Sequence, residues 1–200
     1  MKVIFLIGGI ASGKSSVARE LERRGAVRID LDQVSRDVLA PGSSLVGRIA
    51  DAFGPDLVDA KGTLNRRLLA QRAFASAEET ERLEAIELPA IRDELTMRLD
   101  LLKKGANVPD LVVVEVPLPD RMGEMLGLAD AVVCVSCPRD LRRERAIGRG
   151  MDSSDFDRRA DRQLTDGQMA ALADIVIDNT GDEIALKERT GGLVRRLASA

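Results

Sequence analysis

Residues 8–15 have the sequence Gly-Gly-Ile-Ala-Ser-Gly-Lys-Ser, which combines spaced glycines with a lysine and a hydroxyl side chain. This is the pattern G-x-x-x-x-G-K-[ST], whose backbone N–H groups surround the phosphates of a nucleotide. In such a loop Lys14 reaches the β- and γ-phosphates, and the Ser15 hydroxyl holds Mg²⁺. The pattern therefore predicts a site for ATP with Mg²⁺.

The segments on either side of this loop favour the same function. Residues 2–7 form an apolar run typical of a buried strand, and residues 14–24 have a helical pattern. A phosphate loop needs this order of strand, glycine loop and helix, because the helix N-terminus adds a positive dipole to the loop's N–H groups. A glycine turn that precedes a helix by chance is the alternative, and the complete order disfavours it.

Two carboxylates follow the second predicted strand, residues 26–29. Asp32 is the candidate catalytic residue, because a carboxylate at the tip of a strand beside a phosphate loop can orient or deprotonate an attacking hydroxyl. Asp30 is either a helper or a helix cap, and both residues would only cap a helix in the alternative reading. Arg36 lies four residues after Asp32, where it can meet an anionic group of the acceptor or form an i,i+4 surface pair.

Three arginines fall at i, i+3 and i+7 of one predicted helix: Arg142, Arg145 and Arg149. Phosphoryl transfer needs positive charge around the moving phosphoryl group, and a lid supplies it while excluding water. Gly148 and Gly150 flank Arg149 as candidate hinges. We predict an arginine lid over residues 139–165, and a solvated arginine face is the alternative.

Glu115 ends the third predicted strand and is the candidate carboxylate for Mg²⁺, directly or through water.

The amino-acid composition excludes several other kinds of catalytic and binding site. The chain of 200 residues contains no His, so His-based metal sites and Ser-His-Asp triads are excluded. A net charge of −3 and the lack of Trp and Tyr disfavour nucleic-acid binding. Cys134 and Cys137 lie in an apolar run, which favours a structural role over a redox motif.

The N-terminal segment and the lengths of the apolar runs indicate the expected location. The N-terminus forms a strand rather than a signal peptide, and no apolar run approaches the roughly 18 residues of a membrane helix. We therefore expect a cytoplasmic protein without a membrane partner. A monomer or weak homo-oligomer is the expected assembly.

Alternating strands and helices predict a three-layer α/β fold with a parallel sheet, formed as a single domain over residues 1–200. Only helices are predicted between residues 33 and 104, so residues 42–105 are expected to form an inserted helical subdomain, with one helix interrupted at Pro89 and a second ending at Lys104. The expected strands are residues 3–7, 26–29, 111–116, 131–136 and 175–178.

Several segments taken together resemble the dephospho-coenzyme A kinase family over nearly the whole chain. Phosphate loops are shared by many kinases, so the specific resemblance rests on the other motifs. These motifs are IDLDQVSRDVLAPGS, FGPDLVDAKGTLNRRLLAQRAF, VEVPL, RAIGRG with RRADRQL, and ADIVIDNTG.

The resemblance implies transfer of the ATP γ-phosphate to the 3′-hydroxyl of dephospho-coenzyme A, and a sheet of order 2-3-1-4-5. It implies that Lys14, Asp32 and Arg149 are catalytic and that Asp32, Arg36 and Arg66 contact the acceptor. The metal would be held by Ser15 and Glu115. The residues implied for ATP are Ala11, Ser12, Gly13, Lys14, Ser15, Ser16, Arg145, Asn179 and Gly181.

The chain departs from the family pattern at two places. Leu88-Pro89 stands where the family usually has His-Pro, and Pro119-Asp120 follows the third strand where a Leu-Phe sequence is usual. Both changes fall around the acceptor site implied by the resemblance. The alternatives are therefore a kinase of the same fold that acts on a nucleoside or nucleotide, and a nucleotide-binding regulatory protein that has lost catalysis.

Overall fold

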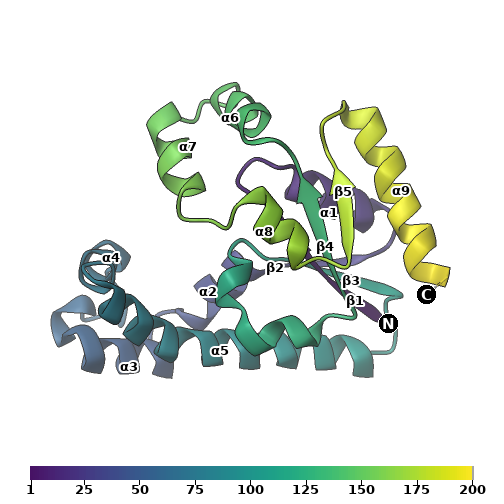
Figure 1. Ribbon diagram of the computed structural model, residues 1–200. Coiled ribbons are helices and arrows are strands. Elements are labelled where there is room, and N and C mark those ends of the chain that lie inside the picture. The colour runs from purple at the N-terminus through teal and green to yellow at the C-terminus, as the bar shows by residue number, and fades with distance from the viewer. Residues whose placement is uncertain (200) are drawn as a thin grey trace. The chain divides into compact units, whose positions relative to one another are not determined.

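Five short runs of aliphatic residues form a parallel sheet in the order β2-β3-β1-β4-β5, in a computed structural model that describes residues 1–199 (Figure 1). This confirms the predicted order and the α/β class. Residue 26 was predicted to lie in β2, but its N–H bonds to the Leu21 carbonyl and completes the end of the preceding helix instead. The strands are β1 (Lys2–Ile7), β2 (Val27–Asp30), β3 (Leu111–Glu115), β4 (Ala131–Ser136) and β5 (Ile175–Asp178).

The centre of the sheet is β1, which pairs with β3 on one side and β4 on the other. Residues 3–7 are buried, as expected for a strand covered on both faces. Ile4 and Leu6 pack into one core cluster with residues of α1 (Lys14–Arg23) and α9 (Glu183–Ser199), so these two helices cover one face. The end of β1 is thereby fixed, and with it the start of the phosphate loop.

The segment between β4 and β5 is divided into three short helices. They are α6 (Arg139–Ile147), α7 (Ser153–Ala160) and α8 (Asp166–Ala171). Asp152 caps α7 by accepting N–H bonds from the first turn, and Thr165 forms a capping box with Gln168 at the start of α8. Because α8 packs against β4, this segment is tied to the sheet near the phosphate loop.

Residues 31–101 form a second unit with its own core; the first unit comprises residues 1–30 and the described residues from 102 onward. Leu45, Ile49 and Phe53 cluster with Leu57 and Leu69 in the second unit. The predicted subdomain boundary of 42–105 stays a prediction. The helices of this part of the chain are α2 (Leu31–Val38), α3 (Ser44–Phe53), α4 (Arg66–Ala73), α5 (Ala77–Lys104) and the 3₁₀ turn η1 (Pro55–Leu57). Two further 3₁₀ segments, η2 (Pro119–Arg121) and η3 (Gly123–Leu128), follow β3.

The helix α5 continues through Pro89, so the predicted interruption there is wrong. Pro89 is exposed, whereas Leu83 and Ile91 on either side of it are buried. A proline inside a helix removes one backbone hydrogen bond and crowds the preceding turn. Burial of apolar residues on both sides keeps the helix continuous despite this local cost.

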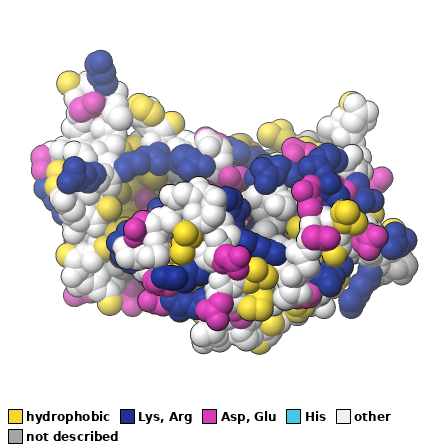
Figure 2. All heavy atoms as spheres, turned by 90° about the horizontal axis from the view of Figure 1, so that it is seen from above, with side chains coloured by type: hydrophobic (Ala, Val, Ile, Leu, Met, Phe, Trp, Pro, Cys, Tyr) yellow, Lys and Arg dark blue, Asp and Glu magenta, His cyan; other side chains and the backbone are white. Residues whose placement is uncertain are grey.

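The surface carries acidic and basic side chains in close proximity. Figure 2 shows Lys and Arg side chains interspersed with Asp and Glu side chains on one face. Several of these charges form exposed ion pairs, such as that between Lys187 and Glu183. Among the described residues, no helix combines the length and the apolar character needed to cross a membrane.

Replacing Pro89 by Ala should stabilise the protein, because alanine restores the missing N–H donor in an exposed helix position. We expect the free energy of unfolding to rise by about 1–2 kcal/mol, measured by urea denaturation. The matched control is Met97→Ala on the same helix, which should change it by less than about 0.5 kcal/mol because Met97 is exposed. A Pro89→Ala variant of unchanged or lower stability would contradict the stated cost of this proline.

Candidate functional site

The phosphate loop connects β1 to α1 with a backbone that is unusual at three positions. Gly8 and Gly13 have φ angles of 145° and 101°, and Ala11 has a φ of 60°. Gly13 caps α1 in the left-handed region, and a Cβ placed there would lie 2.2 Å from the side-chain nitrogen of Asn179. A side chain at Gly13 is therefore disfavoured both by conformation and by the lack of space.

The curvature of the loop leaves several backbone donors available. Within residues 1–199, the N–H groups of Ala11, Gly13 and Ser15 have no hydrogen-bond partner. The ammonium of Lys14 donates to the carbonyl of Gly8 and, at 3.2 Å, to that of Gly9. Unpaired N–H groups next to a lysine and a helix N-terminus form an arrangement suited to phosphate oxygens.

A buried carboxylate lies beside the loop. Glu115, at the end of β3, accepts a hydrogen bond of 2.8 Å from the Ser15 hydroxyl. Its other oxygen is paired with Arg28, whose guanidinium nitrogens approach to 2.5 Å. The structure thus brings together the two predicted metal-site residues, Ser15 and Glu115. Sequence reasoning missed Arg28, because nothing in the β2 sequence indicates a partner on β3.

These two oxygens fit the way in which Mg²⁺ is commonly held. Mg²⁺ usually takes one or two protein oxygens and completes its shell with phosphate oxygens and water. The described residues contain no group of three or more Asp, Glu, Cys or His side chains that could hold a metal by themselves. Ser15 and Glu115 therefore suit a metal that arrives with a nucleotide's phosphates.

The wall of the site opposite the loop comes from the segment after β5. The buried side chain of Asn179 donates to the Ser12 carbonyl at 2.7 Å. Arg145 of α6 donates to the backbone carbonyls of Asn179 and Gly181, at 2.9 and 3.1 Å. These contacts connect four predicted nucleotide-site residues, and the two partners of each hydrogen bond lie more than 30 residues apart in the sequence.

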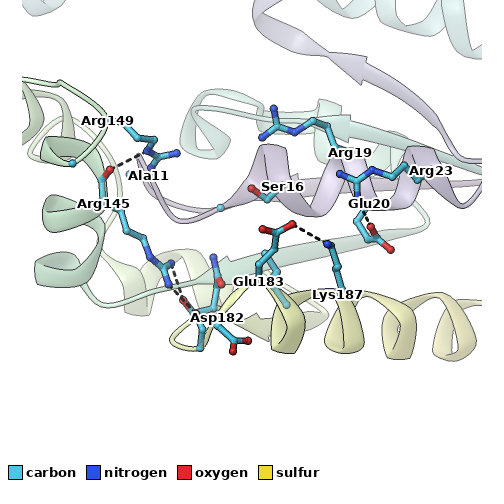
Figure 3. Close-up of a pocket in the computed structure, with 15 residues that line it drawn as sticks. Ala11, Ser16, Arg19, Glu20, Arg23, Arg145, Arg149, Asp182, Glu183 and Lys187 are labelled. Carbon is cyan, nitrogen blue, oxygen red and sulfur yellow. Dashed lines mark hydrogen bonds and ion pairs between the residues drawn. The ribbon is translucent and has the colours of Figure 1, made fainter.

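Two adjoining cavities are lined by the predicted nucleotide residues. The larger, of about 760 Å³, lies between α1, α6 and α9 (Figure 3). The smaller, of about 340 Å³, lies along the phosphate loop. Figure 3 shows Arg145 and Arg149 on one side and Glu183 and Lys187 of α9 on another. Every residue predicted for ATP lines one cavity or both: Ala11, Ser12, Gly13, Lys14, Ser15, Ser16, Arg145, Asn179 and Gly181.

The three arginines of the predicted lid have different environments. Arg142 is buried, with a side-chain exposure of 6%, and forms an ion pair of 2.8 Å with Asp166. It is therefore not a mobile or solvated lid residue, and that interpretation of Arg142 is wrong. Arg149 is exposed beyond the end of α6, where its Nε donates to the Arg145 carbonyl at 2.9 Å. Arg149 lines both cavities.

The second unit contains the predicted acceptor residues. Asp32 lies in the first turn of α2 and is exposed, so its expected place at the tip of the strand is corrected to the helix that follows. Arg66, the first residue of α4, donates from Nη2 to the Arg36 carbonyl at 3.4 Å. Arg36 in turn donates to the Gln33 side chain at 3.0 Å. The structure therefore brings Arg36 and Arg66 together and places Asp32 one turn before Arg36.

Glu87 is a residue of this unit that sequence reasoning missed. Burial raises the pKa of its carboxyl group, and the nearby positive charge of Arg66 offsets part of that effect. A half-buried carboxyl group near Arg66 influences the charge that Arg66 presents. The only sequence signal was an acidic residue directly before Leu88-Pro89.

Both cysteines are free and buried, which agrees with the structural role predicted for them. Burial raises the pKa of Cys134 to about 11; the negative charge of Asp166 adds to this effect and Lys14 opposes it. Burial also raises the pKa of Cys137, with Arg145 and Arg142 opposing the change. Neither thiol has the low pKa of a reactive cysteine.

Comparison with known proteins gives consistent results over the full length. A family model described as dephospho-CoA kinase matches residues 2–184. A dephospho-CoA kinase of Corynebacterium diphtheriae is 39% identical over 200 residues, covering 100% of this chain and 98% of the relative. One of Anaeromyxobacter dehalogenans is 39% identical over 209 residues, with the same two coverages. A solved structure from Thermus thermophilus has a TM-score of 0.80 at 29% identity, covering 99% of this chain and 97% of that chain.

The two thiols should react slowly with a disulfide reagent in the folded protein. A shift of the Cys134 pKa from 9.0 to about 11 reduces its thiolate fraction at pH 8 by about a hundredfold, and burial blocks access as well. Because the raised pKa favours the neutral thiol, reactivity should increase as the pH rises toward 11. Thiol titration at pH 8 should show two reactive groups in urea and almost none before unfolding. Rapid labelling of Cys134 in the folded protein would contradict this assignment.

Proposed function

The chain belongs to the dephospho-CoA kinase family, and we propose that it transfers the γ-phosphate of ATP to the 3′-hydroxyl of dephospho-coenzyme A, which gives coenzyme A and ADP. The observation that carries the proposal is the preformed phosphate loop in a chain whose family similarity extends over nearly its whole length. The loop supports ATP as the phosphate donor, and the family similarity supports dephospho-coenzyme A as the acceptor.

The nucleotide would bind to the first unit. Its phosphates would meet the unpaired N–H groups of Ala11, Gly13 and Ser15, with the Lys14 ammonium beside them. Its base and ribose would occupy the larger cavity, which Asn179 and Gly181 line. Because these donors already point toward the phosphates, they can stabilise the negative charge that moves during the transfer without first rearranging.

Mg²⁺, when bound with ATP, would neutralise part of the charge on the phosphates and thereby favour transfer of the γ-phosphoryl group. Ser15 and Glu115 would hold it. The ion pair of Glu115 with Arg28 keeps the carboxylate in a fixed orientation toward Ser15. Arg145 and Arg149 would contribute further positive charge, with Arg149 the more accessible of the two.

The acceptor would bind to the second unit through Arg36 and Arg66, whose guanidinium groups suit its phosphate groups. Asp32 would accept the proton of the attacking hydroxyl, a role for which its exposed carboxylate is accessible. We retain residues 42–105 as the proposed acceptor-binding subdomain and residues 139–165 as the proposed lid, with Arg142 serving to anchor the lid.

A panel of acceptors tests the proposed activity directly. Purified protein is incubated with Mg·ATP and either dephospho-coenzyme A, a nucleoside, a nucleoside monophosphate or no acceptor, and ADP release is measured. We expect ADP release with dephospho-coenzyme A to exceed all other rates by at least about a hundredfold. Turnover with a nucleoside and none with dephospho-coenzyme A would contradict the proposed acceptor and identify a nucleoside in its place. ATP binding without turnover on any acceptor would favour a regulatory protein.

Replacing Asp32 by Asn tests the proposed base. We expect kcat to fall by about 10²- to 10⁴-fold because the amide cannot accept the proton, while the affinity for ATP stays unchanged. The matched control is Asp51→Asn, which removes an exposed carboxylate from α3 of the same unit and should leave kcat unaltered. An unchanged kcat in the Asp32 variant would show that this carboxylate is not the base.

A further inference from the structure

The peptide groups at Ile10, in the middle of the phosphate loop, are held by two side chains from distant parts of the sequence. The Ile10 N–H donates to Oε1 of Gln163 at 2.7 Å. The Ile10 carbonyl accepts from Nη1 of Arg142 at 3.3 Å. Residue 10 is thus bound on both of its backbone polar groups, and both partners come from the segment between β4 and β5.

Arg142 is firmly fixed in this position. Its Nε donates to the Cys137 carbonyl at 2.9 Å, and its Nη2 pairs with Asp166 at 2.8 Å. The side chain is almost completely buried, so loss of the ion pair would leave an unpaired charge inside the protein. A fixed guanidinium is a rigid support for the loop rather than a group that moves with substrate.

The glycine at position 9 of the loop leaves space for the guanidinium of Arg142. A Cβ at Gly9 would lie 2.2 Å from Nη1 of Arg142, so Arg142 fills the space in which a side chain at residue 9 would lie. The same Nη1 donates to the Ile10 carbonyl, so one placement of the guanidinium explains both contacts. The lack of space accounts for a third glycine in the loop, because Gly9 is not one of the two glycines that the general pattern requires.

Gln163 extends the same support to the other side of the site. Its Nε2 donates to the Pro117 carbonyl at 3.2 Å while its Oε1 holds the Ile10 N–H. Pro117 follows Val116 directly after β3, which ends in Glu115. One half-buried amide therefore fixes the phosphate loop relative to the segment that carries the proposed metal carboxylate.

The consequence for binding follows from the direction of the N–H groups. Because the Ile10 N–H is bound to Gln163, it does not point toward a ligand, whereas those of Ala11, Gly13 and Ser15 stay unpaired. A loop that already has its bound shape loses less conformational entropy on binding. We propose that Gln163 and Arg142 are positioning residues that hold the Ile10 peptide groups from both sides and so preset the phosphate loop for the β-phosphate of its nucleotide.

This inference rests on the nucleotide binding in the proposed function, but it does not depend on the acceptor. The first test is Gln163→Met, which keeps the side-chain length and removes both hydrogen bonds. We expect the affinity for Mg·ADP to fall about tenfold, by isothermal titration calorimetry, with little change for AMP in a competition assay. The matched control is Glu188→Met, which changes an exposed side chain of similar length on α9 that lines neither cavity and should alter neither affinity.

A second measurement reports on the hydrogen bond itself. Amide exchange at Ile10, followed by NMR, should become faster in Gln163→Met and stay slow in Gln163→Glu, because glutamate keeps the acceptor oxygen. Arg142→Lys retains a charge for Asp166, so it should remain folded and show the same selective loss of ADP affinity. Thermal unfolding of each variant confirms that the comparison is between folded proteins.

Two outcomes would overturn the positioning role. One is faster exchange at Ile10 with an unchanged affinity for Mg·ADP. The other is an equal loss for ADP and AMP, which would indicate a general structural defect. A wild-type protein that binds Mg·ADP but transfers no phosphate to dephospho-coenzyme A would contradict the proposed acceptor and leave the positioning role intact.

Discussion

The direction of the backbone N–H groups in the phosphate loop is the constraint on which the rest of the site depends. Backbone donors bind phosphate only if the loop turns them inward, and a short glycine-rich chain does not hold such a turn by itself. Side chains from outside the loop hold it here. Asn179 binds the Ser12 carbonyl, while Gln163 and Arg142 bind Ile10. The segments after β4 and β5 are therefore part of the phosphate site.

The arginines of the first unit divide into supports and groups available to a ligand. Arg28 and Arg142 are paired with Glu115 and Asp166, so their charges are largely compensated within the protein. Arg149 is exposed beside the loop and has no such carboxylate partner among the residues described. Only some of the arginines in this unit are therefore available to bind an anionic ligand. The others, Arg28 and Arg142, hold neighbouring groups in position.

Local patterns in the sequence predicted the strand–loop–helix unit, because burial periodicity and the spacing of Gly13, Lys14 and Ser15 are local properties. The strand order is not a local property, and it was predicted only from the resemblance to the kinase family. Predictions failed where a distant contact decides the outcome. Pro89 lies in a continuous helix because buried residues on both sides hold it. The roles of Arg142 and Gln163 depend on contacts more than 130 residues away in sequence, which no spacing rule indicates.

The proposed role of this loop is to direct the γ-phosphoryl group of ATP to a sugar hydroxyl of dephospho-coenzyme A. The decisive experiment identifies the product by ³¹P NMR after incubation with Mg·ATP and dephospho-coenzyme A. We expect a new phosphomonoester resonance coupled to the ribose 3′ proton, in amounts equal to the ADP formed. ADP accompanied only by inorganic phosphate, or a phosphomonoester at another position, would contradict it.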